Sequence, residues 1–513
     1  MNFLKAKSRT GIIWFILAVL ATALAAVVLP PLWSISLAVF LILVVFFTRH
    51  LVLGMLILVF LFPYTGLRVD LSGVQALRNI PFLNQLNAPL ADVFAVILFL
   101  AWLVTLIKSL SASPFQKGGL RPASPSLGGG ILGEFSHWKS FLVFFLSGAV
   151  SLLNVSSQYF WSSVKYLTRV VLFFYAAFFV PIISIMRQEG KNTEEEGVPS
   201  ILTKVLKVMY WTGLLSALMG LVSFFVVPAV GFPRATPFSI FGFTPLGVNH
   251  NLLAETLVAT APAGFFLWWL GKDRAPTPIG IGVGALSGPN WFFAGSLLQV
   301  VIALLTFART AWIALAIQFC LFIIFWFRLP RPGGAERGGR AKEFFQRVWP
   351  FLFFVAPLLV IFIWTTGAQI VQESTLARLD MARISWFYFW QTPLIGQGIG
   401  TFVNSLWGIR AFLLDYGEPL EAHGVVWKLL FEQGLFGLLS FIFFIGMILW
   451  TIYLEMKEGG RIAKAVATMA MVMATGVLAY ELFNTTYYTS KLWVPLAVAA
   501  GAVSLLKSEK LKV

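Results

Sequence analysis

The chain has 513 residues, of which 59% are hydrophobic and only 11% are charged, and its formal net charge is +16. A water-soluble domain carries about 25% charged residues, so this composition excludes a soluble enzyme and a disordered protein alike. The single cysteine, Cys320, excludes an intrachain disulfide framework. Apolar runs of about twenty residues, rather than alternating strands of about ten, predict an all-α polytopic integral membrane protein with no strands, and exclude a transmembrane β-barrel.

Hydropathy divides the chain into about fourteen membrane-spanning segments. The third is short enough to be re-entrant, which leaves twelve or thirteen spans as alternatives. In chain order the segments are centred on 11–28, 31–47, 51–63, 89–107, 140–154, 166–186, 205–227, 250–270, 291–307, 311–327, 348–366, 434–454, 465–483 and 491–506.

The basic residues sort to one side of these spans. With the N-terminus in the cytoplasm, most of the 37 Lys and Arg lie on the inner side, whereas the 21 Asp and Glu divide about evenly. This positive-inside bias puts both termini in the cytoplasm, so the net charge indicates membrane orientation and not a nucleic-acid partner. The N-terminal segment is also similar to a signal peptide. Because a second span follows almost at once and cleavage would leave an odd number of spans, we expect an uncleaved first helix.

Loop composition divides the chain into four parts. They are N-terminal spans in 1–245, a transmembrane core in 246–366, a long outer loop in 367–433 and C-terminal spans in 434–513. Three inner loops, 109–134, 271–290 and 328–343, are rich in Gly, Pro and Ser. Such composition predicts flexible segments without a core of their own.

The outer loop differs from the others because it is long and is not of low complexity. Ser374 is a suitable N-cap for a first helix, and Pro393 stops that helix. The expected elements are a helix over 374–391, a glycine-rich turn over 396–400, an amphipathic run over 401–416 and a helix from about Ala422 that enters the twelfth span. Long ordered loops are often functional, so we expect a small helical domain on the outer face.

Cations near the outer boundary of the spans are the strongest indication of function, because a charge at membrane depth costs roughly 2.5–3.5 kcal/mol unless it is compensated. Arg309 lies in a hinge between two apolar stretches. Its side chain could reach toward the lipid headgroups or bind a phosphate-like anion. The other outer cations are Lys165, Arg169, Arg234, Arg378 and Arg383. Positive charge is disfavoured outside, so this cluster predicts an anionic partner such as a lipid-linked phosphate or pyrophosphate.

Lys165 and Arg169 are four residues apart and would share a helix face at the start of the sixth span. Ordinary contact with lipid headgroups is the alternative for this pair.

Two of the four histidines, His250 and His423, face outward. His250 comes about one helical turn before Glu255, and Glu421 comes two residues before His423. A neighbouring carboxylate would raise the pKa of the His423 imidazole and orient it, which suits a general base for a sugar hydroxyl. A hydrated histidine at a helix start is the alternative.

Motifs for metals and nucleotides are absent from the sequence. It has no HExxH motif, no Cys/His cluster, no Asp-x-Asp pair and no P-loop. We therefore expect no metal, no cofactor and no ATP-driven transport.

Four segments, in order, resemble the O-antigen ligase and polymerase superfamily of bacterial envelope enzymes. Residues 308–312 are similar to its Ser-Arg-x-x-Trp segment, with Ala in place of Ser. The stretch from Arg378 and the turn 393–402 resemble its arginine helix and its Pro-x-x-Gly-x-Gly-x-Gly-x-Phe turn. Residues 423–437 resemble its His-Asn…Glu-x-Gly-x-x-Gly segment, and 249–255 is a looser match.

The resemblance covers roughly residues 245–445. It departs from the family pattern at Gly424, where Asn is common, and at Ala382, where Trp is frequent. These departures bear on how His423 is positioned and on how the outer loop packs.

The resemblance implies a GT-C-like multi-helix fold with one large helical periplasmic loop, in a bacterial inner membrane. It also implies an enzyme that uses undecaprenyl-pyrophosphate-linked glycans at the periplasmic face without a metal. Carried over by position, Arg309, Arg378 and Arg383 would bind the pyrophosphate, and His423 would orient or deprotonate the acceptor hydroxyl. Accessory candidates are His250, Glu255, Arg234, Lys165, Arg169 and Glu421. The motifs leave three acceptors open: a lipid A core sugar, a second lipid-linked repeat and a protein.

Two other classes of function compete with this one. A lipid-linked oligosaccharide flippase would also need buried cations, but the chain has no detectable internal repeat and its large one-sided loop has no role in alternating access. In a non-catalytic assembly partner, the outward arginines would serve only as lipid contacts.

Overall fold

The computed structural model describes residues 31–70, 87–111, 136–190, 198–227, 233–273, 289–328, 376–419, 421–484, 487 and 489–510. Several expected elements lie outside these residues. They are the first span 11–28, the eleventh span 348–366, the beginning of the outer loop with Ser374, and most of the three Gly/Pro/Ser-rich inner loops.

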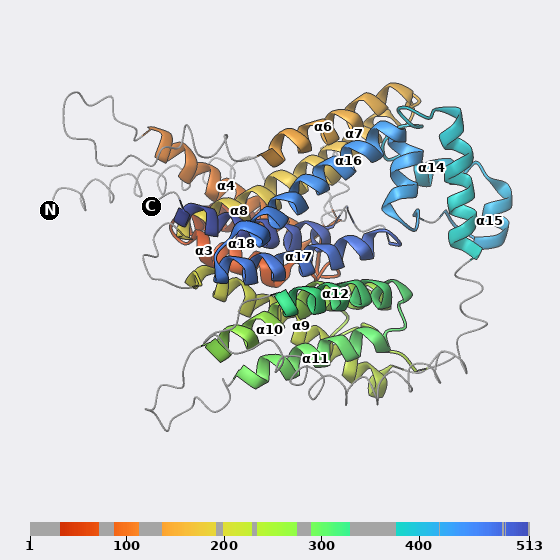
Figure 1. The fold of residues 1–513 in the computed structure, drawn as a ribbon. Helices are drawn as coiled ribbons and strands as arrows, with labels where there is room; N and C mark the ends of the chain where they lie inside the picture. The colour runs from red at the N-terminus through yellow and green to blue at the C-terminus, as the bar shows by residue number, and fades with distance from the viewer. Residues whose placement is uncertain are drawn as a thin grey trace.

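The described chain is helical almost throughout (Figure 1). Before and after the outer region, its helices are α2 (Pro31–Arg49), α3 (Leu51–Leu61), α4 (Leu90–Ser111), α6 (Ser136–Ser151), α7 (Phe160–Tyr166) with η3 (Leu167–Phe179) and α8 (Val180–Gly190), α9 (Ser200–Val226), α10 (His250–Asp273), α11 (Pro289–Leu305), α12 (Arg309–Arg328), α16 (Val425–Glu458), α17 (Arg461–Glu481) and α18 (Ser490–Lys510). The outer region consists of a helix over 376–391, α14 (Phe402–Leu406) and α15 (Arg410–Tyr416).

Within the described residues, six helices are long and apolar enough to cross a membrane. The consecutive helices α2 and α3 are bent by 116° at His50, so the expected second and third spans form one broken span or a re-entrant loop. The apolar helices α11, α12 and α18 are shorter. This architecture confirms the all-α polytopic membrane fold predicted from the sequence.

One expectation was wrong, because a short two-stranded ribbon joins α3 to α4. Strand β1 (Arg68–Asp70) pairs antiparallel with β2 (Asn87–Pro89). Its backbone groups satisfy one another where the chain has left the helices. Gly66, just before β1, donates a hydrogen bond to the Pro245 carbonyl at 2.9 Å, and this bond ties the connection to the segment before α10.

A buried glutamine joins the three helices whose outer ends form the candidate site. The Gln318 side chain on α12 donates to the Val258 carbonyl of α10 at 3.0 Å and to the Val472 carbonyl of α17 at 3.2 Å. A buried amide must find partners, and here it satisfies itself on the backbones of two neighbouring helices. The register of α10, α12 and α17 is thereby fixed.

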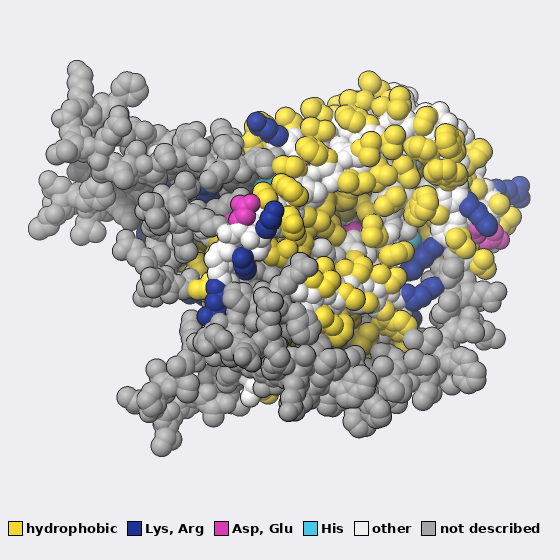
Figure 2. All heavy atoms as spheres, viewed as in Figure 1, with side chains coloured by type: hydrophobic (Ala, Val, Ile, Leu, Met, Phe, Trp, Pro, Cys, Tyr) yellow, Lys and Arg dark blue, Asp and Glu magenta, His cyan; other side chains and the backbone are white. Residues whose placement is uncertain are grey.

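The outward face of α16 is apolar along its length. Its exposed side chains Leu435, Leu439, Ile442 and Phe443 recur at helical spacing on one stripe. Figure 2 shows that apolar side chains cover a broad area of this side of the molecule. Such a surface is stable in contact with lipid and would be unfavourable in water.

The backbone of the turn over 393–398 forms hydrogen bonds with the backbone of α16 where that helix is kinked. Four bonds, which we call the clamp, join them: Leu435 N to Pro393 O (2.8 Å), Phe436 N to Leu394 O (3.1 Å), Gln397 N to Phe431 O (2.8 Å) and Gly398 N to Glu432 O (2.9 Å). In an unbroken helix the amides of 435 and 436 would bond to the carbonyls of 431 and 432. Gly434, with φ +63° and ψ −159°, breaks the helix and frees those groups for the turn.

We expect Gly396→Ala to weaken this clamp. Gly396 has φ +70°, and an added Cβ would overlap the backbone of Glu432 and Gln433. The loss of unfolding free energy should be about 2 kcal/mol or more, measurable as a lower thermal midpoint in detergent. Gly446→Ala, on the same helix α16, is the matched control, because nothing lies within 4 Å of its added Cβ. Equal midpoints for the two variants would contradict the clamp.

Candidate active site

Arg309 is the first residue of α12 and follows a tight hinge from α11. Phe307 has φ +56°, a left-handed conformation that is rare outside glycine, and it turns the chain sharply. The Thr306 hydroxyl accepts a hydrogen bond from Ala308 N at 3.2 Å and donates to the Ala303 carbonyl at 2.6 Å. The half-buried Arg309 therefore lies at a helix N-terminus, where the helix dipole also favours an anion.

Arg234 is brought beside this hinge by the segment that precedes α10. Ala235 N donates to the carbonyl of Leu305, the last residue of α11, at 2.9 Å. Thr236 N donates to the Ser223 hydroxyl of α9 at 3.0 Å. These two bonds fix the segment between α9 and the hinge, so Arg234 and Arg309 approach the same region from different elements.

Arg378 comes from the opposite side, on the helix 376–391. That helix buries Met381 and Ser385 against the rest of the outer region, while Arg378 is half-buried. Its Nε is buried and has no hydrogen-bond partner in the described part of the chain. Burial, and then the positive charge of Arg309, lower the pKa of Arg378. The guanidinium still remains charged, so two mutually repelling cations share a site that an anion would stabilise.

His423 is held in the segment directly before α16. Gly424 has φ +122°, and a Cβ there would lie 2.6 Å from the Leu482 carbonyl at the end of α17. Gly424, which stands where the family pattern has Asn, thus lies at a close approach of two backbones. This contact packs the segment that carries His423 against the end of α17. The half-buried His423 faces the charges of Arg378 and Glu421.

The Glu421 carboxylate raises the pKa of His423 as expected, but burial and Arg378 outweigh it. Burial lowers the pKa of His423 to about 4, the charge of Arg378 adds to this effect, and Glu421 opposes it only in part. Desolvation and a cation both disfavour the imidazolium. The imidazole is therefore neutral at pH 7 and able to accept a proton.

The beginning of α10 completes the group. His250, its first residue, lies within electrostatic range of Arg234 and Arg378. The Tyr480 hydroxyl at the end of α17 donates to the Asn251 carbonyl at 2.7 Å and lies within electrostatic range of Arg378. Tyr480 is fully buried and holds the end of α17 against the beginning of α10.

Five of the sequence-predicted residues therefore converge at one end of the molecule: Arg234, His250, Arg309, Arg378 and His423. In Figure 2, basic side chains and a histidine gather at the end where Figure 1 has α14 and α15. Glu255, one turn further along α10, is buried beneath them and interacts with Lys491, whose Nζ donates to the Leu252 carbonyl at 2.8 Å.

Three predicted cations have other surroundings. Arg169 pairs with Asp92 of α4 at 3.9 Å. It lies in the π-helical stretch η3, which directly continues α7, the helix that carries Lys165. Arg383 is 76% exposed and pairs with Asp380 at 3.2 Å, and Asp380 also accepts a 2.9 Å hydrogen bond from the Tyr416 hydroxyl. Arg383 thus stabilises the outer helices, while Arg378 on the same helix faces the site.

Residues 294–442 match a family model described as O-antigen ligase, and this stretch contains Arg309, Arg378 and His423. This match supports membership of the O-antigen ligase superfamily. No curated protein matches it significantly. At the level of this ligase and polymerase family, membership indicates a multi-pass membrane enzyme with lipid-linked glycan and acceptor substrates.

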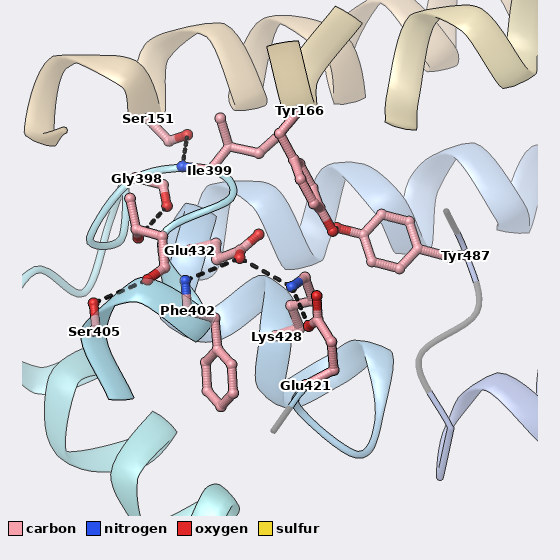
Figure 3. A network of polar contacts seen from close by, with 11 residues as sticks. Ser151, Tyr166, Gly398, Ile399, Phe402, Ser405, Glu421, Lys428, Glu432 and Tyr487 are labelled. Atoms are coloured by element: carbon pink, nitrogen blue, oxygen red, sulfur yellow. Dashed lines mark hydrogen bonds and ion pairs between the residues drawn. The ribbon is translucent and has the colours of Figure 1, made fainter. Parts of the chain in front are cut away.

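Glu421 has a partner that the sequence analysis missed. The Lys428 ammonium lies 2.6 Å from Glu421 Oε2 and 3.1 Å from Glu432 Oε1 (Figure 3). Lys428 and Glu432 are both buried, one helical turn apart in an apolar helix. This spacing of four residues could have predicted the ion pair from the sequence, because a charge at membrane depth needs an opposite charge close by. Tyr480 and Lys491 gave no such signal, since their partners are more than two hundred residues away.

Among the described residues, no group of three or more His, Cys, Asp or Glu side chains is arranged to hold a metal ion. The charges that meet in the candidate site are instead guanidinium groups.

We expect Arg378→Gln to raise the pKa of His423. The charge of Arg378 disfavours the imidazolium, so its removal should move the pKa from about 4 toward the ordinary value of histidine. Titration of ¹³C-labelled histidine by NMR would measure this shift. Arg383→Gln removes the same charge from the same helix at an exposed position, and it should leave the titration unchanged. Equal shifts of the His423 pKa in both variants would contradict the placement of Arg378 beside His423.

Proposed function

We propose that this protein is a glycosyltransferase that moves a glycan from an undecaprenyl-pyrophosphate carrier to an acceptor hydroxyl at the periplasmic face. One observation carries the proposal: Arg309 and Arg378, from elements about seventy residues apart, meet next to a neutral His423. Two converging guanidinium groups match a pyrophosphate, and a neutral imidazole matches a hydroxyl proton.

The two arginines act on the donor. Transfer breaks the bond between the anomeric carbon and the pyrophosphate oxygen, and the pyrophosphate leaves with the bonding electrons. Arg309 and Arg378 stabilise the negative charge that grows on that oxygen, and the dipole of α12 has the sign that favours it. Arg234 and His250 are candidates for contact with the second phosphate. We propose that the reaction needs no metal, because the guanidinium groups supply the charge stabilisation.

His423 acts on the acceptor. As the acceptor oxygen bonds to the anomeric carbon, its proton passes to the neutral imidazole. A base with a pKa of about 4 is weak, and Arg378 contributes to that low value. A bound pyrophosphate offsets the charge of Arg378, so we propose that donor binding raises the pKa of His423 and activates the base only when the donor is present.

The proposed orientation puts the site outside and both termini in the cytoplasm of a bacterial inner membrane. It is supported by the positive-inside distribution of Lys and Arg along the sequence. The acceptor is a lipid A core sugar, a second lipid-linked repeat or a protein, and these define a ligase, a polymerase and a protein O-oligosaccharyltransferase.

The decisive experiment supplies purified protein with a defined undecaprenyl-pyrophosphate glycan and EDTA, with one candidate acceptor in each reaction. We expect product with one of the three acceptors, which also identifies the subclass. A donor that binds but never reacts would overturn the proposal. In proteoliposomes, translocation of the donor without transfer would favour a flippase instead.

We expect His423→Gln to lower kcat by about 10²- to 10⁴-fold, the usual contribution of a general base, with little change in donor affinity. Arg378→Gln and Arg309→Gln should each weaken donor binding by roughly tenfold to a hundredfold, because charge-assisted hydrogen bonds contribute about 1.5–3 kcal/mol. Donor titrations and initial rates measure the two effects separately. Full activity of His423→Gln would remove the histidine from the mechanism.

The pH dependence should differ between free and donor-bound enzyme. Because kcat/KM reports the free enzyme, its acid limb should lie near pH 4, below which His423 becomes protonated. The acid limb of kcat should lie at higher pH, because the bound pyrophosphate raises the pKa of His423. Initial rates over a range of pH and donor concentration test this order. Coincident limbs would contradict activation of the base by the donor.

A further inference from the structure

The buried ammonium of Lys428 is the meeting point of two parts of the chain. It is 1% exposed and contacts Glu421 on one side and Glu432 on the other. The rings of Tyr166 and Phe402 lie 5.1 and 5.7 Å from it, so aromatic faces bound the remaining space. Figure 3 shows these groups converging from α16, the outer turn and the membrane helices.

Through Glu432, Lys428 is joined to the part of the outer loop that carries Arg378. Glu432 Oε1 accepts a 3.3 Å hydrogen bond from the backbone amide of Phe402, the first residue of α14, and the Glu432 carboxylate also interacts with the backbone of Gly400. The clamp described above fixes the preceding turn on α16 by its backbone. Glu432 thus secures the end of the turn whose beginning follows the Arg378 helix.

Through Glu421, Lys428 is joined to the segment that carries His423. Glu421 comes two residues before His423, and Gly424 fixes the other side of that histidine against α17. The 2.6 Å contact between Lys428 and Glu421 therefore closes a short loop around His423.

We infer that Lys428 is a positioning residue that sets the placement of His423 relative to Arg378 by binding Glu421 and Glu432 together. This inference rests on the proposed function for its catalytic consequence. Lys428 is buried behind the turn, and it acts through its two carboxylate partners. Buried ion pairs often add little net stability, whereas a small misplacement of a catalytic group can cost about a hundredfold in rate.

The most selective variant is Glu421→Gln, because it loosens the hold on the His423 segment and leaves the buried pair of Lys428 and Glu432 intact. Glu418→Gln is the matched control, since it removes the same charge from an exposed side chain three residues earlier. We expect Glu421→Gln to keep donor affinity within twofold and to lower kcat at least tenfold, and we expect the control to stay within twofold of the unaltered protein in both.

A second readout does not depend on activity. His423 faces the charges of Arg378 and Glu421. Loss of the Glu421 charge alone would lower the pKa of His423 further, whereas release of the segment into water would raise it toward the ordinary value of histidine. Labelled histidine has only four signals in this chain, and His423→Gln identifies the relevant one. Positioning therefore predicts a rise in Glu421→Gln.

The double variant Lys428→Met with Glu432→Gln removes both fully buried charges. The Glu421 carboxylate loses its partner, but its side chain is 36% exposed and can be hydrated. The double variant should bind donor and transfer at least tenfold more slowly. Unchanged kcat in this variant or in Glu421→Gln, or a His423 pKa that stays or falls, overturns the inference. If the unaltered protein transfers nothing but the pKa rises in Glu421→Gln, the proposed function fails while the positioning role of Lys428 stands.

Discussion

The candidate site depends on an exchange of backbone hydrogen bonds between the 393–398 turn and the kink of α16. Two amides and two carbonyls of that helix bond to the turn instead of to each other, so every freed group is satisfied. The exchange locks the end of the 376–391 helix onto a membrane helix that itself begins one residue after Gly424. Arg378 and His423 are thus both attached to α16, which holds them at a fixed distance from each other. A flexible loop would not do so.

Electrostatic interactions among the side chains of the site determine its proposed chemistry. Arg309 and Arg378 repel one another, and Arg378 also disfavours protonation of His423. Without an anion the site is destabilised by like charge, and His423, the base in the proposed mechanism, accepts a proton only weakly. A pyrophosphate would relieve the repulsion and strengthen the base together, so donor binding and proton transfer would be coupled by Coulomb interactions alone. The buried Lys428 is a different case, because Glu421 and Glu432 already compensate its charge, and the role we propose for it is to position other groups.

The sequence predicted the parts that depend on local rules. The first outer helix ends at 391 before Pro393, and the glycine-rich stretch after it forms a turn. The run 401–416 is divided into α14 and α15, and the helix expected from about Ala422 begins at Val425. Arg309, Arg378 and His423 were all identified as candidates. The pKa direction of His423 was not predictable, because burial and Arg378 outweigh the nearby carboxylate only once the chain is folded.

The sequence by itself determined that the chain is a bundle of apolar helices, and it identified a small set of cations expected at the outer boundary, because hydropathy and helix breakers act within about twenty residues. Only the tertiary structure decided which cations meet. Arg383 turned outward to Asp380 and Arg169 to Asp92, while Arg234, Arg309 and Arg378 converged from three separate elements. The reason is physical: a charge in a low-dielectric environment is governed by whichever partners the packing brings within a few ångströms, and sequence distance does not limit that choice.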